Sequence, residues 1–148
     1  MKIRDATVED LKFISEIESA CWGGNGASLD EFQEFISGKS KSEFLQVLES
    51  NGNVQGFIGY SYDIHENSIY IWNLAVSSQF QRSGYGTQLI KQVLSVGKLL
   101  KAKSLTLEVS ESNLGAIELY QKLGFENNSK IKNYYPDGSA GFKFSLSI

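Results

Sequence analysis

The chain has 148 residues with a formal net charge of −3, one cysteine, 41% hydrophobic and 12% aromatic residues. A chain of this length and composition can bury a core without disulfides or a structural metal, so we expect a single globular domain over residues 1–148. The basic residues are spread along the sequence, which argues against a nucleic-acid ligand. Cys21 has no cysteine partner, which argues against a metal site and favours the reducing cytoplasm. No apolar leader or membrane-length segment is present, which argues against a membrane ligand.

The N-terminal residues predict a short strand followed by a helix. Residues 3–6 are a candidate first strand. Thr7 followed three positions later by Asp10 is a variant of the helix-capping pattern, and the apolar residues after it keep the helical period to about Trp22. We therefore expect the chain to enter its first helix directly from a strand.

A loop and a second helix are expected next. Residues 23–27 are rich in glycine, which predicts a loop. Ser28 with Glu31 three positions later is a capping box that begins a helix, and Gly38 has the position of a residue that ends it. Two helices therefore precede the main sheet.

The middle of the sequence predicts a hairpin and a buried strand. Residues 44–49 and 54–62 flank Asn51-Gly52, a dipeptide that supplies the positive φ angles of a tight β-turn. After a second turn, residues 69–76 form an almost continuous apolar run, which is typical of a strand covered on both faces. This run is expected to lie at the centre of the sheet.

The second half of the sequence predicts helices that alternate with strands. Apolar residues recur at helical spacing over 84–103, and residues 105–109 alternate between apolar and polar as a half-buried strand does. Residues 112–123 predict a helix that Gly124 ends, and two further strands flank the turn at 136–138. Strands joined through helices imply a mixed α/β sheet with at least one parallel pair. A monomer or a weak homodimer is expected; the sequence does not decide between them, although an exposed C-terminal strand could pair with another chain.

The turn Gln81-Arg-Ser-Gly-Tyr-Gly-Thr87 lies between the buried strand and the long helix. The first N–H groups of a helix have no partner within it, and Gly84 and Gly86 let phosphate oxygens approach the backbone. The turn lacks the Gly-Lys-Ser/Thr of a nucleoside triphosphate loop and the three-glycine spacing of a dinucleotide fold. The turn fits a phosphate group, and the alternative is a plain glycine-containing connection.

Several segments resemble the signature segments of the GNAT acetyltransferases, and more narrowly those of the RimI-type enzymes, which acetylate the N-terminal alanine of a ribosomal protein. The GNAT segments are Asn73-Leu-Ala-Val76, residues 81–87, residues 113–120 and Leu123-Gly-Phe125. The RimI-type segments are Leu107-Glu-Val109, Ser112-Asn113, residues 116–120, Leu123-Gly-Phe125 and Asn133-Tyr-Tyr-Pro136. The resemblance spans roughly the second half of the chain. It implies the GNAT fold, with a mixed central sheet of six to seven strands, about four flanking helices and a splayed parallel pair at the acetyl-CoA site.

The resemblance also implies which residues hold acetyl-CoA. Backbone groups of one strand would bind the pantetheine arm, backbone amides of the turn would bind the pyrophosphate, and Asn113 would contact the cofactor. The strand residues are Leu74, Ala75 and Val76, and the turn residues are Arg82, Ser83, Gly84, Tyr85, Gly86 and Thr87.

Direct acetyl transfer to an amine needs a base, because an α-amine with a reference pKa of about 7.7 to 8.0 is mostly protonated at pH 7. The resemblance assigns the proton acceptor to Glu108, directly or through a water, and the proton donor for the leaving thiolate to Tyr120. The alternative for Glu108 is a solvated strand glutamate, which is less common opposite apolar neighbours in an interior strand. For Tyr120 the helical spacing alone favours a core aromatic residue, and only the resemblance reverses this. Cys21 is not expected to act as a nucleophile, since nothing links it to His65, the only histidine.

Acceptor contacts are suggested at Trp22, Tyr134 and Tyr135, each of which has packing as its alternative role. RimI-type sequences carry Pro-Trp-Ser in the first interhelical loop, whereas this chain has the glycine-rich residues 23–27 there. The acceptor that the resemblance implies is a protein N-terminus, ribosomal in the RimI case. The alternatives are a small amine such as a polyamine or an amino sugar, or acyl-CoA binding by a sensor without turnover.

Overall fold

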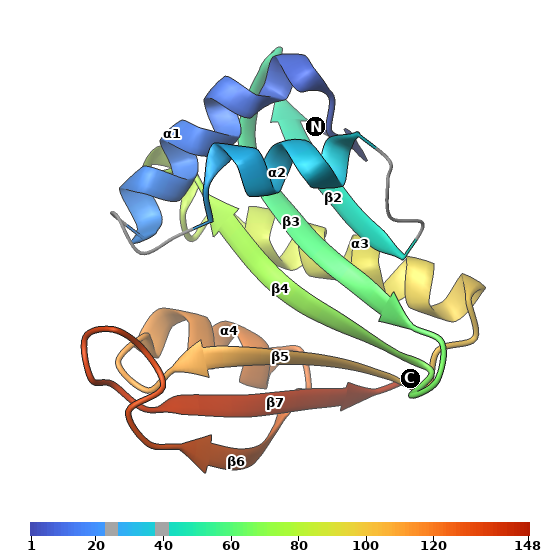
Figure 1. The fold of residues 1–148 in the computed structure, drawn as a ribbon, viewed down its shortest axis with the longest axis vertical. Helices are drawn as coiled ribbons and strands as arrows, with labels where there is room; N and C mark the ends of the chain where they lie inside the picture. The colour runs from blue at the N-terminus through green and yellow to red at the C-terminus, as the bar shows by residue number, and fades with distance from the viewer. Residues whose placement is uncertain (23–26, 38–41) are drawn as a thin grey trace. The chain divides into compact units, whose positions relative to one another are not determined.

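The computed structural model describes residues 1–22, 27–37 and 42–148. Most of the predicted glycine-rich loop, residues 23–26, and the predicted helix end at Gly38 lie outside the described residues. Strands and α-helices follow one another in the predicted order, and Figure 1 labels all of them except β1. The chain divides into two compact units: the first consists of Met1–Ser61 and Asn73–Val93, and the second of Tyr62–Trp72 and Leu94–Ile148.

The first unit contains two helices and an antiparallel part of the sheet. Its elements are β1 (Lys2–Asp5), α1 (Leu11–Trp22), α2 (Leu29–Ile36), β2 (Glu43–Ser50) and most of β3 (Asn53–Asp63). Strand β2 pairs antiparallel with both β1 and β3. Asn51 and Gly52 have φ angles of 54° and 80°, so the predicted hairpin with its tight turn is confirmed.

The apolar faces of α1 and α2 form the core of the first unit with the strands. Ile14 of α1 and Phe32 of α2 are fully buried, and the Phe32 ring meets Phe57 of β3 edge-on, with 5.5 Å between ring centroids. Burying side chains of this size contributes about 1.5–3 kcal/mol each. The Ser28 side chain accepts the Glu31 N–H at 3.2 Å, so the predicted N-cap of α2 is present.

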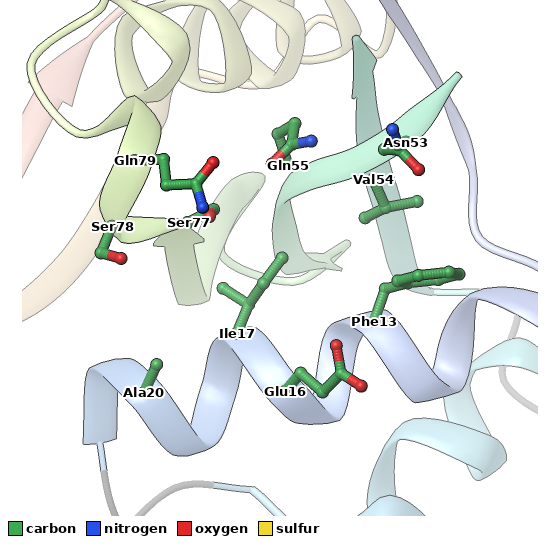
Figure 2. A pocket seen from close by; sticks show the side chains of 10 residues that line it. All are labelled: Phe13, Glu16, Ile17, Ala20, Asn53, Val54, Gln55, Ser77, Ser78 and Gln79. Atoms are coloured by element: carbon green, nitrogen blue, oxygen red, sulfur yellow. The ribbon is translucent and has the colours of Figure 1, made fainter. Parts of the chain in front are cut away.

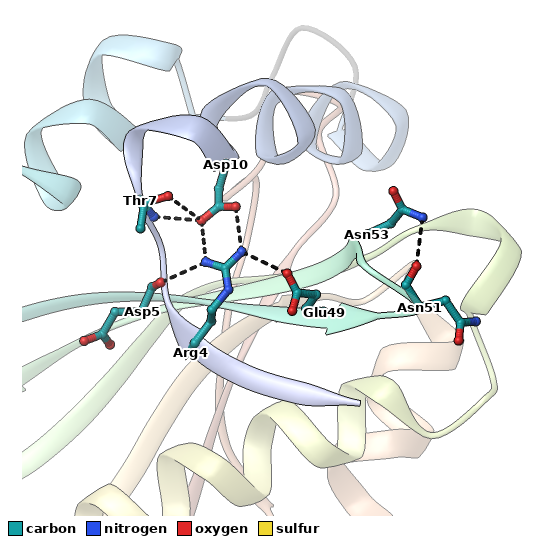
Figure 3. Close-up of polar contacts among 7 residues, drawn as sticks. All are labelled: Arg4, Asp5, Thr7, Asp10, Glu49, Asn51 and Asn53. Atoms are coloured by element: carbon teal, nitrogen blue, oxygen red, sulfur yellow. Dashed lines mark hydrogen bonds and ion pairs between the residues drawn. The ribbon is translucent and has the colours of Figure 1, made fainter.

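A polar cluster joins β1 to the start of α1 (Figure 3). The Arg4 guanidinium donates to both carboxylate oxygens of Asp10, at 2.7 and 3.0 Å, and to Glu49 of β2 at 3.3 Å. The Asp10 carboxylate also accepts the Thr7 backbone N–H at 2.7 Å, so the predicted contact between these two residues is present. The chain first forms a 3-10 turn, Val8–Asp10, from which α1 continues.

The second unit contains the parallel pair of strands. Its strands are β5 (Ser104–Ser110), β6 (Glu126–Ile131), β7 (Gly141–Ser147) and the part of β4 (Ser68–Val76) that ends at Trp72. Strands β4 and β5 run parallel, from Ser68 opposite Ser104 to Ile71 opposite Leu107. The strand order is β1-β2-β3-β4-β5-β7-β6 in a seven-stranded sheet, so the predicted mixed sheet with a parallel pair is confirmed.

The C-terminal strand β7 is internal, so the expectation that it could pair with another chain is wrong. It runs antiparallel to β5 on one side and to β6 on the other. The edge position belongs instead to β6, which precedes β7 in the sequence. Both hydrogen-bonding sides of β7 are therefore used within the chain.

Two further helices complete the described elements. Helix α3 (Tyr85–Leu99) begins in the first unit and ends in the second, and α4 (Leu114–Lys122) belongs to the second. Leu89, Ile90 and Val93 of α3 are buried, in agreement with the helical spacing of the sequence. Among the described residues, no helix combines the length and the apolar character that crossing a bilayer requires.

Candidate active site

The predicted phosphate turn connects β4 to α3 within the first unit. After Val76 the chain forms a short 3-10 turn, Ser78–Phe80. The Gln81 side-chain amide donates back to the Val76 carbonyl at 3.2 Å, and the Ser83 N–H donates to the carbonyl of Phe80 at 3.2 Å. These bonds hold the turn in a compact form before α3 begins.

The backbone of this turn is suited to an anion. Arg82 and Gly84 have φ angles of 67° and 89°, in the left-handed region, which turns the chain sharply into α3. The helical hydrogen bonds begin with the Gln88 N–H, which donates to the Gly84 carbonyl at 3.0 Å, so the N–H groups of residues 85–87 precede them. A Cβ at Gly84 would meet no atom within 4 Å. Open space, helix N-terminal amides and the exposed Arg82 cation together fit a pyrophosphate.

Two side chains of the turn are engaged with the protein itself. Tyr85 stacks on Phe80, with 5.3 Å between ring centroids, and donates its hydroxyl to Ser50 of β2 at 2.9 Å. Ser83 donates both its N–H and its hydroxyl to the Phe80 carbonyl. The side chain of Tyr85 therefore anchors the turn, which leaves a cofactor role to its backbone N–H.

The segment predicted to bind the pantetheine arm is the end of β4, Leu74–Val76, in the first unit. Ala75 is buried, whereas Leu74 and Val76 are half-buried. The Val76 carbonyl accepts the Gln81 amide and also, at 3.7 Å, the Cys21 thiol of α1. Burial raises the pKa of this thiol, and Glu18 adds to the rise, so Cys21 stays protonated and is a poor nucleophile.

A buried carboxyl group lies close to this segment and was not among the predicted site residues. Glu18 of α1 is 3% exposed, and its Oε2 accepts a hydrogen bond from the side-chain amide of Asn73 at 2.6 Å. Burial raises the pKa of Glu18, and the hydrogen bond from Asn73 offsets part of the rise. The only sequence signal for this burial is the helical period, which puts Glu18 on the same face of α1 as Ile14 and Ile17.

In the second unit, Glu108 lies on the polar face of β5, as the alternation of this strand predicts. The apolar residues of β5 are buried on the other face. The register sets Tyr70 of β4 opposite Thr106, and Lys143 of β7 opposite Glu108. Because residues two apart on a strand share a face, Tyr70, Glu108 and Lys143 lie on one face of this part of the sheet.

Three tyrosines lie around the Glu108 carboxylate. The Tyr134 hydroxyl donates a hydrogen bond to Oε2 of Glu108. Burial raises the pKa of Tyr70, and the Glu108 carboxylate raises it further. Burial and the same carboxylate raise the pKa of Tyr135 to about 12. Sequence reasoning did not single out Tyr70, because its place beside Glu108 depends on the register between β4 and β5.

Tyr120, the predicted proton donor, lies in the core of the second unit. It is 7% exposed, and its ring centroid is 5.7 Å from that of Phe125 and 6.2 Å from that of Phe144. Burial raises the pKa of its hydroxyl and the nearby Tyr135 adds to the rise, so the phenol keeps its proton at neutral pH and is a weaker acid than a free tyrosine. Tyr135 adds to the burial that raises the pKa of Tyr120, and Glu108 adds to the burial that raises the pKa of Tyr135, so Tyr135 lies near both the predicted acid and the predicted base.

Two predicted site residues lie at helix ends. Asn113 is the N-cap of α4, where its side-chain oxygen accepts the Ala116 N–H at 3.2 Å. The amide of an asparagine also carries N–H donors, and these are the groups that it can offer to a cofactor. Trp22 is the last residue of α1 and 39% exposed, next to residues that lie outside the described part of the chain.

A pocket of about 310 Å³ lies in the first unit (Figure 2). Phe13, Ile17 and other residues of α1, the charged Glu16 among them, form one wall. Residues of Asn53–Gln55 and Ser77–Gln79, most of them polar, form the rest. None of its lining residues is a predicted site residue. Within the described residues, no three His, Cys, Asp or Glu side chains are grouped so that they could hold a metal ion.

The sequence is similar to those of known acetyltransferases. Residues 11–125 match the Acetyltransferase (GNAT) family, and this stretch includes residues of both units. A [ribosomal protein bS18]-alanine N-acetyltransferase of Escherichia coli (strain K12) is 34% identical over 102 residues, which are 69% of this chain and 68% of that protein. An L-2,4-diaminobutyric acid acetyltransferase of Vibrio parahaemolyticus is 29% identical over 111 residues, which are 74% of this chain and 61% of that protein.

The fold is similar to that of a solved structure as well. The crystal structure of Ard1 from Thermoplasma volcanium matches 99% of this chain and 97% of its own, with a TM-score of 0.89 and 26% sequence identity. The seven-stranded mixed sheet with its parallel pair agrees with the predicted GNAT fold. The chain therefore belongs to the GNAT family of acetyltransferases and is an N-acetyltransferase that uses acetyl-CoA as its acetyl donor.

Proposed function

We propose that the chain acetylates the α-amino group of a protein N-terminus, with the preference of the RimI-type enzymes for a terminal alanine. The observation that carries the proposal is the cluster of Glu108 with Tyr134 and Tyr135, near which the buried Tyr120 keeps its phenolic proton. The similar Escherichia coli protein acts on an alanine of ribosomal protein bS18, and we extend this class of acceptor to the present chain.

We propose that backbone groups hold acetyl-CoA. The pantetheine arm is assigned to Leu74, Ala75 and Val76, and the pyrophosphate to the turn of residues 82–87. The left-handed φ angles of Arg82 and Gly84 support the second assignment, because they aim the helix N-terminus at open space. Asn113 is proposed to contact the cofactor through its side-chain N–H groups.

The proposed chemistry uses one carboxylate and one phenol. When bound, acetyl-CoA supplies the thioester carbonyl carbon that the amine attacks. Glu108 accepts, directly or through a water, the proton that the ammonium group must lose before its nitrogen can attack, and the nitrogen gives up a second proton to solvent as the amide forms. Tyr120 gives its phenolic proton to the sulfur as the C–S bond breaks, so that CoA leaves as a thiol. Proton exchange then returns both side chains to their starting states.

The acceptor class is tested by thiol release from acetyl-CoA with a panel of amines. Hexapeptides that begin with alanine, serine or glycine are compared with polyamines and amino sugars. We expect kcat/KM for the alanine peptide to exceed that for every small amine by at least about tenfold, a difference of about 1.4 kcal/mol. Turnover with small amines alone would contradict the proposed acceptor, and no turnover with any amine would contradict transfer altogether.

The assigned roles are tested by Glu108→Gln and Tyr120→Phe. We expect each change to lower kcat by about 100-fold, because a positioned acid or base contributes that much or more. Acetyl-CoA affinity, measured by calorimetry, should stay within about twofold of the wild-type value. Glu126→Gln removes an exposed strand glutamate from β6 and serves as the matched control. Unchanged kcat in the Glu108 and Tyr120 variants would show that the roles are wrongly assigned.

A small-molecule amine is the second candidate acceptor, and the similarity to a diaminobutyric acid acetyltransferase favours it. Binding of acyl-CoA by a sensor without turnover has less support, since a pure binder needs neither Glu108 nor Tyr120. We also propose a cytoplasmic location, which the free and half-buried Cys21 supports because a reducing compartment suits a lone thiol.

A further inference from the structure

The loop between β6 and β7 brings one tyrosine onto the proposed base. Tyr134 lies 26 residues beyond Glu108 in the sequence, and its hydroxyl donates to Oε2 of that carboxylate. The side chain is 43% exposed, so burial in the core does not fix its position. The position of the Tyr134 ring must therefore be set by the backbone of the loop and by the residue on which the ring packs.

The backbone of the loop is fixed by hydrogen bonds on both sides of the tyrosine. Asn133 has a φ angle of 53°, which turns the chain just before Tyr134. The N–H groups of Tyr134 and Tyr135 both donate to the Ser139 carbonyl, at 3.1 and 3.2 Å. The Ser139 hydroxyl lies 2.8 Å from the hydroxyl of Ser110, the last residue of β5. The loop is thus tied to the same strand that carries Glu108.

Gly141, the first residue of β7, provides the space for the ring. A Cβ on this glycine would lie 2.7 Å from Cδ2 of Tyr134, closer than real side-chain carbons approach one another, and 3.1 Å from Cγ, which is tighter than most such contacts. The φ angle of Gly141 is not among the positive ones of the chain, so its backbone conformation does not require glycine. The position needs glycine because the tyrosine ring covers its Cα.

We infer that Tyr134 is a positioning residue for the proposed base: its hydroxyl holds one carboxylate oxygen of Glu108, and Gly141 leaves the space in which its ring lies. This inference rests on the proposed function, because it gives Glu108 the role of the proton acceptor. A charge-assisted hydrogen bond from a phenol restricts the carboxylate to one orientation and leaves Oε1 to take up a proton. It also gives Tyr134 a role other than contact with the acceptor.

The hydrogen bond itself is tested without any assay of activity. The protein is labelled with ¹³C at the Cζ atoms of tyrosine, and the Tyr134 signal is assigned by its loss in Tyr134→Phe. The hydrogen bond to Glu108 is the largest cause that raises the pKa of Tyr134, so its titration should lie above the ordinary value of about 10. In Glu108→Gln it should fall toward that value. An ordinary titration in the wild type would overturn the inference.

Steady-state kinetics then separate positioning from acceptor binding. In Tyr134→Phe we expect kcat to fall by about tenfold or more, since one hydrogen bond to a charged group is lost. The KM values for acetyl-CoA and for the peptide should stay within about twofold. The matched control is Tyr62→Phe, which removes another hydroxyl of the second unit, one that donates to Asn67 at 2.7 Å. A raised peptide KM with unchanged kcat would mean that Tyr134 binds the acceptor instead.

The role of Gly141 is tested by Gly141→Ala, alone and together with Tyr134→Ala. The single change should lower kcat as Tyr134→Phe does, because it displaces the ring while the hydroxyl is retained. In the Tyr134→Ala background, Gly141→Ala should lower kcat no further, whereas the effects of two independent sites would add. Thermal unfolding of each variant shows whether the fold is kept. Full additivity in folded variants would overturn the role of Gly141. Absence of transferase activity in the wild-type chain would contradict the proposed function. The titration of Tyr134 would still show whether its hydrogen bond to Glu108 is present.

Discussion

Glu18 carries a carboxyl group that the core of the first unit surrounds. Neither its Oε1 nor the Oδ1 of its partner Asn73 has a hydrogen-bond partner of good geometry among the described residues. Both atoms are acceptors when Glu18 is ionised. The backbone of Ala27 lowers the pKa of Glu18 in part, as Asn73 does, but buried acceptors without a well-placed donor are costly. A proton on the carboxyl group would supply a donor, which agrees with the direction in which burial moves the pKa of Glu18.

We expect the free energy of unfolding to fall as the pH rises through the pKa of Glu18. The pKa is raised in the folded state, so between the unfolded value and the folded value the folded chain binds more protons, and stability is lost toward higher pH. Glu18→Gln should remove this loss, because a glutamine amide offers N–H donors at every pH. Urea unfolding from pH 5 to pH 8 measures the slope, which has a limit of about 1.4 kcal/mol per pH unit for one proton.

Glu16→Gln, which changes an exposed glutamate of the same helix, is the control for Glu18→Gln. It should leave the pH dependence of the wild type unchanged. Equal slopes in the wild type and Glu18→Gln would contradict the raised pKa.

For single residues, the sequence predicts the positions that follow from a local pattern. Glu108 was placed on a polar face by strand alternation, and the structure has it there. Tyr70 joins the same face through a pairing of strands far apart in the sequence, which alternation cannot predict. Glu18 was not singled out as a site residue, because a helical period shows that a residue faces the core but not which polar partner it meets there.

At the scale of elements, the junction of β1 with α1 depends on one ion pair. Burial raises the pKa of Asp10, but the hydrogen bonds and charge of Arg4 and the N–H of Thr7 outweigh it, so the pKa is lowered overall. The carboxylate is 6% exposed and the Arg4 side chain 27% exposed, so water screens the pair only in part. The strand and the helix are thus joined by a charged contact as well as by the chain.

Asp10→Asn should destabilise the protein by about 1.5–3 kcal/mol at pH 7, the range for hydrogen bonds to charged groups. Because the folded pKa of Asp10 is lowered, its contribution is present above the unfolded pKa and is lost as the pH falls through the folded one. The difference between wild type and variant should therefore shrink in acid. Chemical denaturation at pH 7 and pH 3 measures it.

Asp30→Asn, in the first turn of α2, is the matched control for Asp10→Asn. Asp30 is exposed, so its replacement should cost less than about 0.5 kcal/mol. A cost for Asp10→Asn no larger than that of the control would show that the junction does not depend on the ion pair.

The order of the elements was predictable, whereas their ends and neighbours were less so. Helix α4 was expected from Ser112 but begins at Leu114, because Asn113 caps it from outside. The 3-10 turn Ser78–Phe80 was not predicted, since three residues carry no periodic signal. The place of β7 between β5 and β6 was missed because strand order depends on long-range pairing that no local pattern encodes.

At the scale of the whole molecule, the two outer strands of the sheet are poor surfaces for self-association. Strand β1 is four residues long and carries three charged side chains, Lys2, Arg4 and Asp5. Strand β6 is exposed over Glu126–Lys130, and its pairing with β7 is irregular between Asn127 and Ser129. Short, charged and irregular edge strands are the means by which proteins avoid pairing with other chains.

We therefore expect the chain to be a monomer. Light scattering coupled to size-exclusion chromatography should give the mass of one chain, 16.4 kDa, at every concentration up to about 100 µM, where a micromolar dimer would be largely formed. A mass that rises toward twice this value within that range would contradict the expectation and point to an interface other than these edges.

The boundaries between the two units fall inside β3, β4 and α3, at Ser61/Tyr62, Trp72/Asn73 and Val93/Leu94. Neither unit is thus a continuous length of chain. A single cut at any of these boundaries therefore gives fragments that contain only part of at least one unit. No truncation from one end of the chain leaves one unit complete and free of the other. Separating the unit that contains the proposed pyrophosphate turn from the unit that contains Glu108 would require a changed order of the chain segments rather than a shorter gene.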